Sequence, residues 1–158
     1  MFIKVGVGVQ MYLMFVVFVV VIVDQITKYI VLSTMTEGMS LPIIDNIFHL
    51  TLVLNPGAAF GMLEHNRDFF IIMASLVLLA VVLMRKKILE EPFAIQLGIA
   101  LFVGGALGNL IDRIQTGLVV DFFDFRIWPV FNMADIAICM GVGVMIWSII
   151  CDEMMKKK

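Results

Sequence analysis

Charge, cysteine and histidine are all scarce in this sequence. Only 15 % of the 158 residues are charged and the net charge at pH 7 is −2, so the basic excess that nucleic-acid binding requires is missing. The two cysteines, Cys139 and Cys151, lie in one apolar run, too far apart along a helix to bridge. These scarcities argue against a nucleic-acid-binding protein, a disulfide framework and a cysteine-ligated zinc site.

Apolar residues, by contrast, are abundant. They make up 62 % of the chain, and the mean hydropathy is +1.08, whereas a soluble domain is about half apolar. A membrane-spanning helix needs about 20 largely apolar residues. Four stretches qualify or nearly so, at about 5–32, 69–84, 93–111 and 134–151. We therefore predict a single integral membrane domain over residues 1–158, an all-α bundle of four transmembrane helices.

The basic residues predict the orientation of this bundle. Lys4 precedes the first run and could mark a secretory signal peptide. That run is longer than a signal-peptide core and no small-x-small cleavage site follows it, so we predict a retained helix. Basic clusters at 85–87 and 156–158 fall on the same side as Lys4. Short cytoplasmic loops are enriched in Lys and Arg. We therefore expect both termini in the cytoplasm and the segments 33–68 and 114–133 outside.

The two outer segments carry strand-like patterns. Ile47–Leu54 alternates polar with apolar residues, and Val119–Ile127 is rich in valine and phenylalanine. We predict a small extracytoplasmic β-element that rests on the outer membrane surface. We also predict a short interfacial helix over Gly57–Asn66.

Two aspartates on the outer side are candidates for chemistry. Asp121 and Asp135 are each flanked by apolar residues, and ionisable groups near membrane segments are costly enough to suggest function. Two close carboxylates in an apolar site share one proton, so one can activate water while the other protonates a carbonyl oxygen. Two alternatives stay open at this point. Asp135 could merely cap the fourth helix, and Asp112 could be the catalytic carboxylate instead.

Other polar residues gather at the same level. Asp24 and Lys28 have the spacing of a helical ion pair. Asp112 and Arg113 suggest local pairing or positioning. Three asparagines could each cap a turn or helix, or could together bind a substrate backbone; they are Asn55, Asn109 and Asn132. Pro56 and Gly57 predict a turn, followed by small alanines that could admit an extended peptide, and the glycines of GGALGN predict close helix packing.

Other functions have weaker support in the sequence. The histidines, His49 and His65, stand in no H-x-x-E-H pattern, and no metal site is predicted. No G-x-S-x-G elbow is present, and the serines have no convincing base beside them; they are Ser33, Ser40, Ser75 and Ser148. A transporter or channel would need carboxylates near the bilayer midplane. A non-catalytic assembly factor gives no reason for aspartates and asparagines to converge on one side.

Four motifs, in order along nearly the whole chain, resemble those of the lipoprotein signal peptidase (signal peptidase II) family. They are DQITK from Asp24, NPGAAFG from Asn55, GGALGNLIDR from Gly104 with the later VVDF ending at Phe122, and FNMAD ending at Asp135. Any one of these motifs is weak evidence, whereas four in order are highly specific.

The resemblance implies both the activity and the residues that perform it. It implies an aspartyl endopeptidase with catalytic Asp121 and Asp135, and it does not assign Asp112 to that pair. The residues implied to support the site or bind substrate are Asp24, Lys28, Asn55, Gly57, Asn109, Arg113 and Asn132. The implied substrate is a diacylglyceryl-modified prolipoprotein, cut N-terminal to the lipidated cysteine at the outer face of the bacterial cytoplasmic membrane. No cofactor is implied, membrane lipids are partners, and inhibition by the cyclic peptide globomycin is expected.

Overall fold

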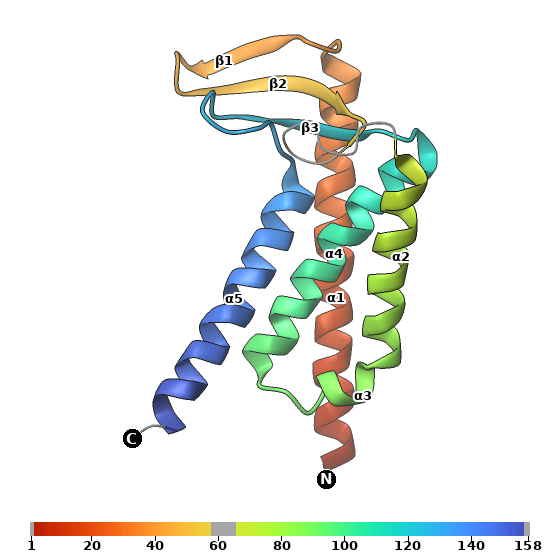
Figure 1. The fold of residues 1–158 in the computed structure, drawn as a ribbon, viewed down its shortest axis with the longest axis vertical. Helices are drawn as coiled ribbons and strands as arrows, with labels where there is room; N and C mark the ends of the chain where they lie inside the picture. The colour runs from red at the N-terminus through yellow and green to blue at the C-terminus, as the bar shows by residue number, and fades with distance from the viewer. Residues whose placement is uncertain (1, 58–65, 157–158) are drawn as a thin grey trace.

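The fold is a helix bundle with a small sheet across one end (Figure 1). The computed structural model describes residues 2–57 and 66–156. The helices are α1 (Phe2–Thr34), α2 (Arg67–Leu83), α3 (Arg85–Ile88), α4 (Phe93–Gln115) and α5 (Met133–Lys156). The strands are β1 (Ser40–Ile44), β2 (Phe48–Asn55) and β3 (Val119–Asp124). Both termini and α3 lie at the end opposite the sheet.

Three of the described helices are long and apolar enough to cross a membrane. They are α1 over Gly8–Thr34, α4 and α5. With 17 residues, α2 is shorter than these three helices, so its role as a fourth span stays a prediction. The predicted interfacial helix falls almost entirely on residues 58–65, which lie outside the described residues.

The distribution of polarity in α1 is the reverse of that in a soluble helix. Phe15 and Phe18 are 61 % and 62 % exposed, whereas Asp24 and Lys28 on the same helix are buried. Charged side chains within membrane segments face the interior of the bundle, because lipid offers them no hydrogen bonds. The exposed apolar surface is therefore the surface that suits contact with lipid.

Glycines set the spacing between the helices, as the GGALGN pattern predicts. A Cβ on Gly104 would lie 2.7 Å from Cβ of Val20 on α1. A Cβ on Gly105 would collide with the carbonyl oxygen of Ala134 on α5 and lie 2.8 Å from Cγ1 of Ile138. Small residues let membrane helices approach closely enough for their backbones to pack. Helix α4 is thereby held against both α1 and α5.

The sheet is antiparallel, with strand order β1-β2-β3. Its hydrophobic core joins the sheet to the C-terminal end of α1 and consists of Val31, Met35, Leu52, Val120 and Phe122. The sequence predicted β2 and β3 but not the edge strand β1, whose Pro42 obscures the pattern; proline is tolerated at a sheet edge. The short helix α3 was also not predicted.

The predicted strand Val119–Ile127 is wrong at its C-terminal end. Strand β3 ends at Asp124, and the backbone of Arg126 turns into the left-handed region at φ 65°. Asp124 accepts hydrogen bonds from both the backbone N–H and the guanidinium of Arg126, so the aspartate fixes this turn. As a result Ile127 lies beyond the end of the strand and is 92 % exposed.

Gly105→Ala tests the packing of α4 on α5. We expect a loss of about 1–3 kcal/mol of unfolding free energy, because the added methyl group overpacks a backbone contact. The control is Gly143→Ala on α5, where a Cβ would have no neighbour within 4 Å. That change should leave stability unchanged or raise it by up to about 1 kcal/mol through helix propensity. Thermal unfolding in detergent compares the two, and equal midpoints would contradict the packing account.

Candidate active site

Two aspartates from different elements meet at the end of the helix bundle that carries the sheet. Asp121 lies in the middle of β3 and is only 3 % exposed, and Asp135 lies in the first turn of α5. Asn132 lies between them. Its Nδ2 donates to Oδ1 of Asp121 at 2.7 Å, and its backbone N–H donates to Oδ2 of Asp135 at 3.1 Å. A single residue therefore holds both carboxyl groups.

Asn132 also caps α5. Its Oδ1 accepts the backbone N–H of Asp135 at 3.0 Å, while Oδ2 of Asp135 accepts the backbone N–H of Asn132. This is the reciprocal arrangement of a capping box, with aspartate in the place usually taken by glutamate. The cap and the pair of carboxyl groups are thus one structure, so the two interpretations of Asp135 are not exclusive.

The remaining two carboxylate oxygens each accept a hydrogen bond from another asparagine. Nδ2 of Asn55 donates to Oδ2 of Asp121 at 2.9 Å, and Nδ2 of Asn109 donates to Oδ1 of Asp135 at 2.8 Å. Each of the four oxygens therefore accepts at least one hydrogen bond. The three asparagines bind the aspartates in this structure, and their contact with a substrate stays a prediction.

The environment of Asp121 disfavours its ionised form. Burial raises the pKa of the Asp121 carboxyl from its ordinary 3.8 to about 7, against the opposing effect of the hydrogen bond from Asn55. The nearby charge of Asp135 raises the pKa further, while the amide of Asn132 and the ammonium of Lys28 lower it. A pKa near the working pH is what a residue needs to give and take protons in turn.

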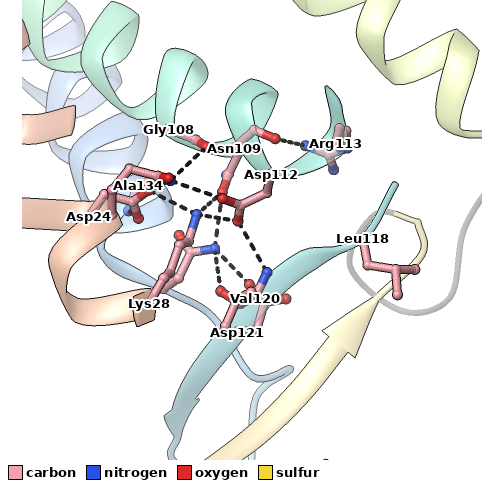
Figure 2. A network of polar contacts seen from close by, with 12 residues as sticks. Asp24, Lys28, Gly108, Asn109, Asp112, Arg113, Leu118, Val120, Asp121 and Ala134 are labelled. Atoms are coloured by element: carbon pink, nitrogen blue, oxygen red, sulfur yellow. Dashed lines mark hydrogen bonds and ion pairs between the residues drawn. The ribbon is translucent and has the colours of Figure 1, made fainter. Parts of the chain in front are cut away.

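A buried ammonium group organises the residues behind this pair (Figure 2). Lys28 is 2 % exposed, and its Nζ lies 2.9 Å from Oδ2 of Asp24 and 2.7 Å from Oδ2 of Asp112. It also donates to Oδ1 of Asn109 at 3.0 Å. These three acceptors match the three N–H donors of an ammonium. The contact with Oδ1 sets the orientation of the Asn109 amide, so that Nδ2 faces Asp135.

Asp112 belongs to the same group of buried polar residues around Lys28. Besides Lys28, it accepts the side-chain amide of Gln25 at 2.9 Å and the backbone N–H of Val120 at 3.2 Å. Its expected local pairing with Arg113 is not what holds it, because its strongest partner comes from α1. Asp112 therefore joins α1, α4 and β3, and these contacts favour a structural role over the catalytic alternative.

Asp24 makes the corresponding connection to α5. Its Oδ1 accepts the backbone N–H of Ala134 at 2.9 Å, next to Asp135 in the chain. A Cβ on Gly108 would collide with this carboxylate, so only glycine fits there. Gln25 bridges Asp24 and Asp112 but was not singled out from the sequence. The sequence did offer a signal for Gln25, because it is a polar amide next to Asp24 in an apolar run.

Arg113 positions the turn beside Asp121. Its Nη2 donates to the carbonyl oxygen of Gly57 at 3.2 Å, and its guanidinium lies 4.7 Å from the ring centre of Phe70 on α2. The backbone N–H of Gly57 donates to Oδ1 of Asn55 at 2.9 Å. Arg113 thereby secures the turn that orients Asn55. The small residues beyond Gly57 in this motif lie outside the described residues.

One statement from the sequence is wrong, because Ser40 does have a base beside it. Its Oγ lies 3.1 Å from Nδ1 of His49 across the β1–β2 pair. Asp124, the residue opposite His49 on β3, accepts hydrogen bonds from Thr51 and Arg126 instead. Burial opposes ionisation of Asp124, but these hydrogen bonds outweigh it and lower its pKa. The contacts at Ser40 thus lack the carboxylate-oriented histidine of a serine triad.

Metal chemistry has no ready site in residues 2–57 and 66–156. No three histidine, cysteine, aspartate or glutamate side chains within these ranges are grouped so as to hold an ion. Cys139 and Cys151 are both free thiols.

The raised pKa of Asp121 predicts a pH dependence of stability. Between about pH 4 and 7 the folded state holds a proton that the unfolded chain releases, so the unfolding free energy falls as pH rises. The full difference in pKa corresponds to about 4 kcal/mol. Asp121→Asn should flatten this fall, as measured by thermal unfolding across that range.

Asp124→Asn is the control of opposite sign. Its folded pKa is depressed, so its contribution is present above about pH 4 and is lost as pH falls further. Removing that carboxylate should lower stability at neutral pH and leave the slope between pH 4 and 7 in place. If Asp121→Asn left the slope unchanged, Asp121 would not be the buried, proton-holding carboxyl.

Comparison with known proteins gives a consistent result. The family model described as Signal peptidase (SPase) II matches residues 16–151. The chain is 44 % identical over 143 residues to a lipoprotein signal peptidase of Pelotomaculum thermopropionicum, covering 90 % of this chain and 94 % of that protein. It is 44 % identical over 131 residues to one of Moorella thermoacetica, covering 83 % and 87 %. A solved bacterial membrane enzyme, 37 % identical, aligns with a TM-score of 0.82 over 90 % of this chain and 89 % of that one. The chain therefore belongs to the signal peptidase II family, the lipoprotein signal peptidases, membrane proteases that cleave signal peptides from prolipoproteins.

Proposed function

We propose that this chain is an aspartic-type endopeptidase in which Asp121 and Asp135 together activate water. The observation that carries the proposal is the arrangement around Asn132, which hydrogen-bonds to both carboxyl groups. With a pKa of about 7, Asp121 holds a proton in a substantial fraction of molecules at neutral pH, which supports a pair that shares one proton. No metal and no covalent intermediate are needed for this chemistry.

The proposed reaction divides the proton transfers between the two carboxyl groups. The ionised carboxylate takes a proton from a water molecule, whose oxygen attacks the scissile carbonyl carbon. The protonated carboxyl donates its proton to the carbonyl oxygen, which gives a neutral tetrahedral diol. The C–N bond then breaks as a proton passes to the leaving amine. One diol hydroxyl returns a proton as the new carboxyl group forms, and the pair again holds one proton.

The surrounding residues keep the two carboxyl groups in place through this cycle. Asn55 and Asn109 each hold one carboxyl oxygen, and Asn132 holds one on each side. Lys28 orients Asn109 from behind, and Arg113 secures the turn at Gly57. We assign positioning roles to Lys28 and Arg113, together with Asp24 on α1. Substrate backbone contacts by the asparagines would arise when a peptide lies across the pair.

The proposed substrate is a prolipoprotein whose cysteine carries a diacylglyceryl group, cut on the N-terminal side of that cysteine. The apolar surfaces of α1, α4 and α5 suit a lipid environment, and the carboxyl pair lies at one end of these helices. A substrate with its signal helix and acyl chains in the bilayer would bring its scissile bond to the membrane surface. Globomycin, a cyclic peptide, is expected to compete for the same site.

The proposed topology has four spans with both termini in the cytoplasm. In this topology α2 is the fourth span, since its 17 residues cover nearly the hydrocarbon thickness. The basic residues Arg85, Lys86 and Lys87 lie in α3, at the end opposite the sheet. The positive-inside rule assigns that end to the cytoplasm and the carboxyl pair to the extracytoplasmic face of a bacterial cytoplasmic membrane.

A proton or ion transporter fits the same observations less well. A transporter needs ionisable groups near the middle of its helices. Here Asp24, Lys28 and Asp112 form one cluster with the carboxyl pair, toward the sheet end of the helices. A non-catalytic assembly factor would not need Asn132 to hydrogen-bond to both aspartates.

Asp121→Asn and Asp135→Asn should each abolish cleavage of a lipidated prolipoprotein by the purified protein in detergent. Loss of either carboxyl group leaves no second partner for proton transfer, and a fall in rate of at least about 10²-fold is expected. Asp124→Asn is the matched control, because it makes the same substitution in the same strand. Its carboxylate is bound by Thr51 and Arg126 rather than by the asparagines. It should retain most of the activity.

Two further controls separate this mechanism from its rivals. Ser40→Ala removes the only described serine hydroxyl found beside a histidine, and it should leave the cleavage rate unchanged. Addition of EDTA should also have no effect. Wild-type rates in either Asn variant, or loss of activity in Ser40→Ala or with EDTA, would refute the aspartic mechanism.

The proposed orientation can be tested by cysteine labelling in a Cys139→Ser, Cys151→Ser background. A membrane-impermeant maleimide added to spheroplasts should label Ile127→Cys, which is highly exposed at the sheet end. It should label Lys87→Cys, in the helix at the opposite end, only after the membrane is permeabilised. The reverse pattern would invert the topology.

A further inference from the structure

A cavity lies at the end of the bundle opposite the carboxyl pair. Helix α4 packs against both α1 and α2, and a cavity of about 160 Å³ opens between these helices near α3. Each of α1 and α4 lines it with residues spaced as one helical face. From α1 these are Gln10, Leu13, Met14 and Val17, and from α4 they are Gln96, Ile99, Ala100 and Val103.

The walls of this cavity are apolar along its length and basic at one end. Arg85, in α3, lines the cavity, and Lys86 and Lys87 follow it in the chain. No carboxylate forms an ion pair with these three residues in the described ranges. Of the two acidic residues that follow, Glu91 lines a different cavity beside α5. The local charge over 85–91 is therefore +1, and Arg85 is free to bind an anion.

Gln96 fixes the backbone at the wall of the cavity and has a side-chain oxygen without a hydrogen-bond donor among the described residues. Its Nε2 donates to the carbonyl oxygens of Glu91 at 2.7 Å and Leu89 at 3.3 Å, which fixes the turn between α3 and α4. Its Oε1 is buried and accepts no hydrogen bond from any described residue. A buried acceptor without a partner is costly, so a donor from a bound molecule would stabilise this wall.

We propose that this cavity binds an anionic phospholipid carrying a headgroup hydroxyl, such as phosphatidylglycerol. The lipid phosphate would pair with Arg85, and one acyl chain would lie between the α1 and α4 faces. From Gln10 to Val17 the α1 face extends about 10 Å from the charged end toward the middle of the bundle. A phospholipid has the same arrangement, with charge at the membrane surface and an apolar chain beneath it. Basic pockets between membrane helices are known to take anionic headgroups.

The test measures lipid retention on the whole protein by native mass spectrometry after release from nanodiscs. The probes are phosphatidylglycerol and the zwitterionic phosphatidylcholine, which has no headgroup hydroxyl. The wild type should retain phosphatidylglycerol in preference. Arg85→Gln should lower that retention about five-fold, whereas the matched neighbour Lys86→Gln, which does not line the cavity, should lower it little.

A second variant tests the apolar part of the site independently of charge. Met14→Trp places a larger side chain in the cavity at a position that is already 64 % exposed, so folding should be retained. It should lower retention of phosphatidylglycerol with Arg85 intact. Thermal unfolding confirms the fold of each variant, and prolipoprotein cleavage by Arg85→Gln should match the wild type.

Several outcomes would overturn the site. Equal losses in Arg85→Gln and Lys86→Gln would mean general attraction to surface charge. Equal retention of the two lipids, or no effect of Met14→Trp, would mean unspecific lipid contact. A stable dimer that excludes lipid would make the groove an interface between two copies. None of these outcomes bears on the carboxyl pair, so this inference and the aspartic mechanism fail separately.

Discussion

The ammonium group of Lys28 is the constraint on which the rest of the site depends. It is buried between carboxylates on α1 and α4 and donates to Asn109. Asp24 continues the connection to the first turn of α5, and Asp112 continues it to the backbone of β3. Removing one partner of a buried ion pair leaves an uncompensated charge, which is strongly destabilising. The elements that carry Asp121 and Asp135 are therefore both fixed by the same cation.

Membrane insertion explains why such a cluster can exist in so small a protein. The helices expose apolar side chains to lipid and reserve their interior for polar groups and glycines. Gly105 and Gly108 let α4 approach α5 and the Asp24 carboxylate without a side chain between them. Close backbone packing excludes water from the cluster and makes its hydrogen bonds stronger than they would be at a surface. The same exclusion of water raises the pKa of Asp121.

The sequence predicted the parts of this structure that follow from the energetic cost of placing a charged residue in an apolar segment. Charge inside an apolar run is expensive, so Asp24, Lys28, Asp121 and Asp135 could be singled out before any fold was known. Strands β2 and β3 were visible in alternating polarity. The pairing of Asp112 with Lys28, and not with adjacent Arg113, could not be predicted, because it depends on the rotation of α1 against α4.

The contact between Ser40 and His49 was hidden for a related reason. It arises from the register of β1 on β2, and β1 itself carries no clear pattern. The end of β3 was also hidden, because Asp124 turns inward to bind the backbone of Arg126, where alternation would have continued the strand. In each case the structure depends on a contact between strands or within a turn, which the alternation of polar and apolar residues along the chain does not predict.

Asn109 separates the buried ammonium of Lys28 from one member of the proposed catalytic pair. A direct contact would place the positive charge of Lys28 against the Asp135 carboxyl group. Instead a neutral amide stands between them, accepting from Lys28 at one end and donating to Asp135 at the other. The Asn109 amide therefore fixes the orientation of the Asp135 carboxyl group. The positive charge of Lys28 does not touch that group. For Asp121, burial has the largest effect on the pKa and the charge of Lys28 the smallest, so the pKa of this carboxyl rises to about 7.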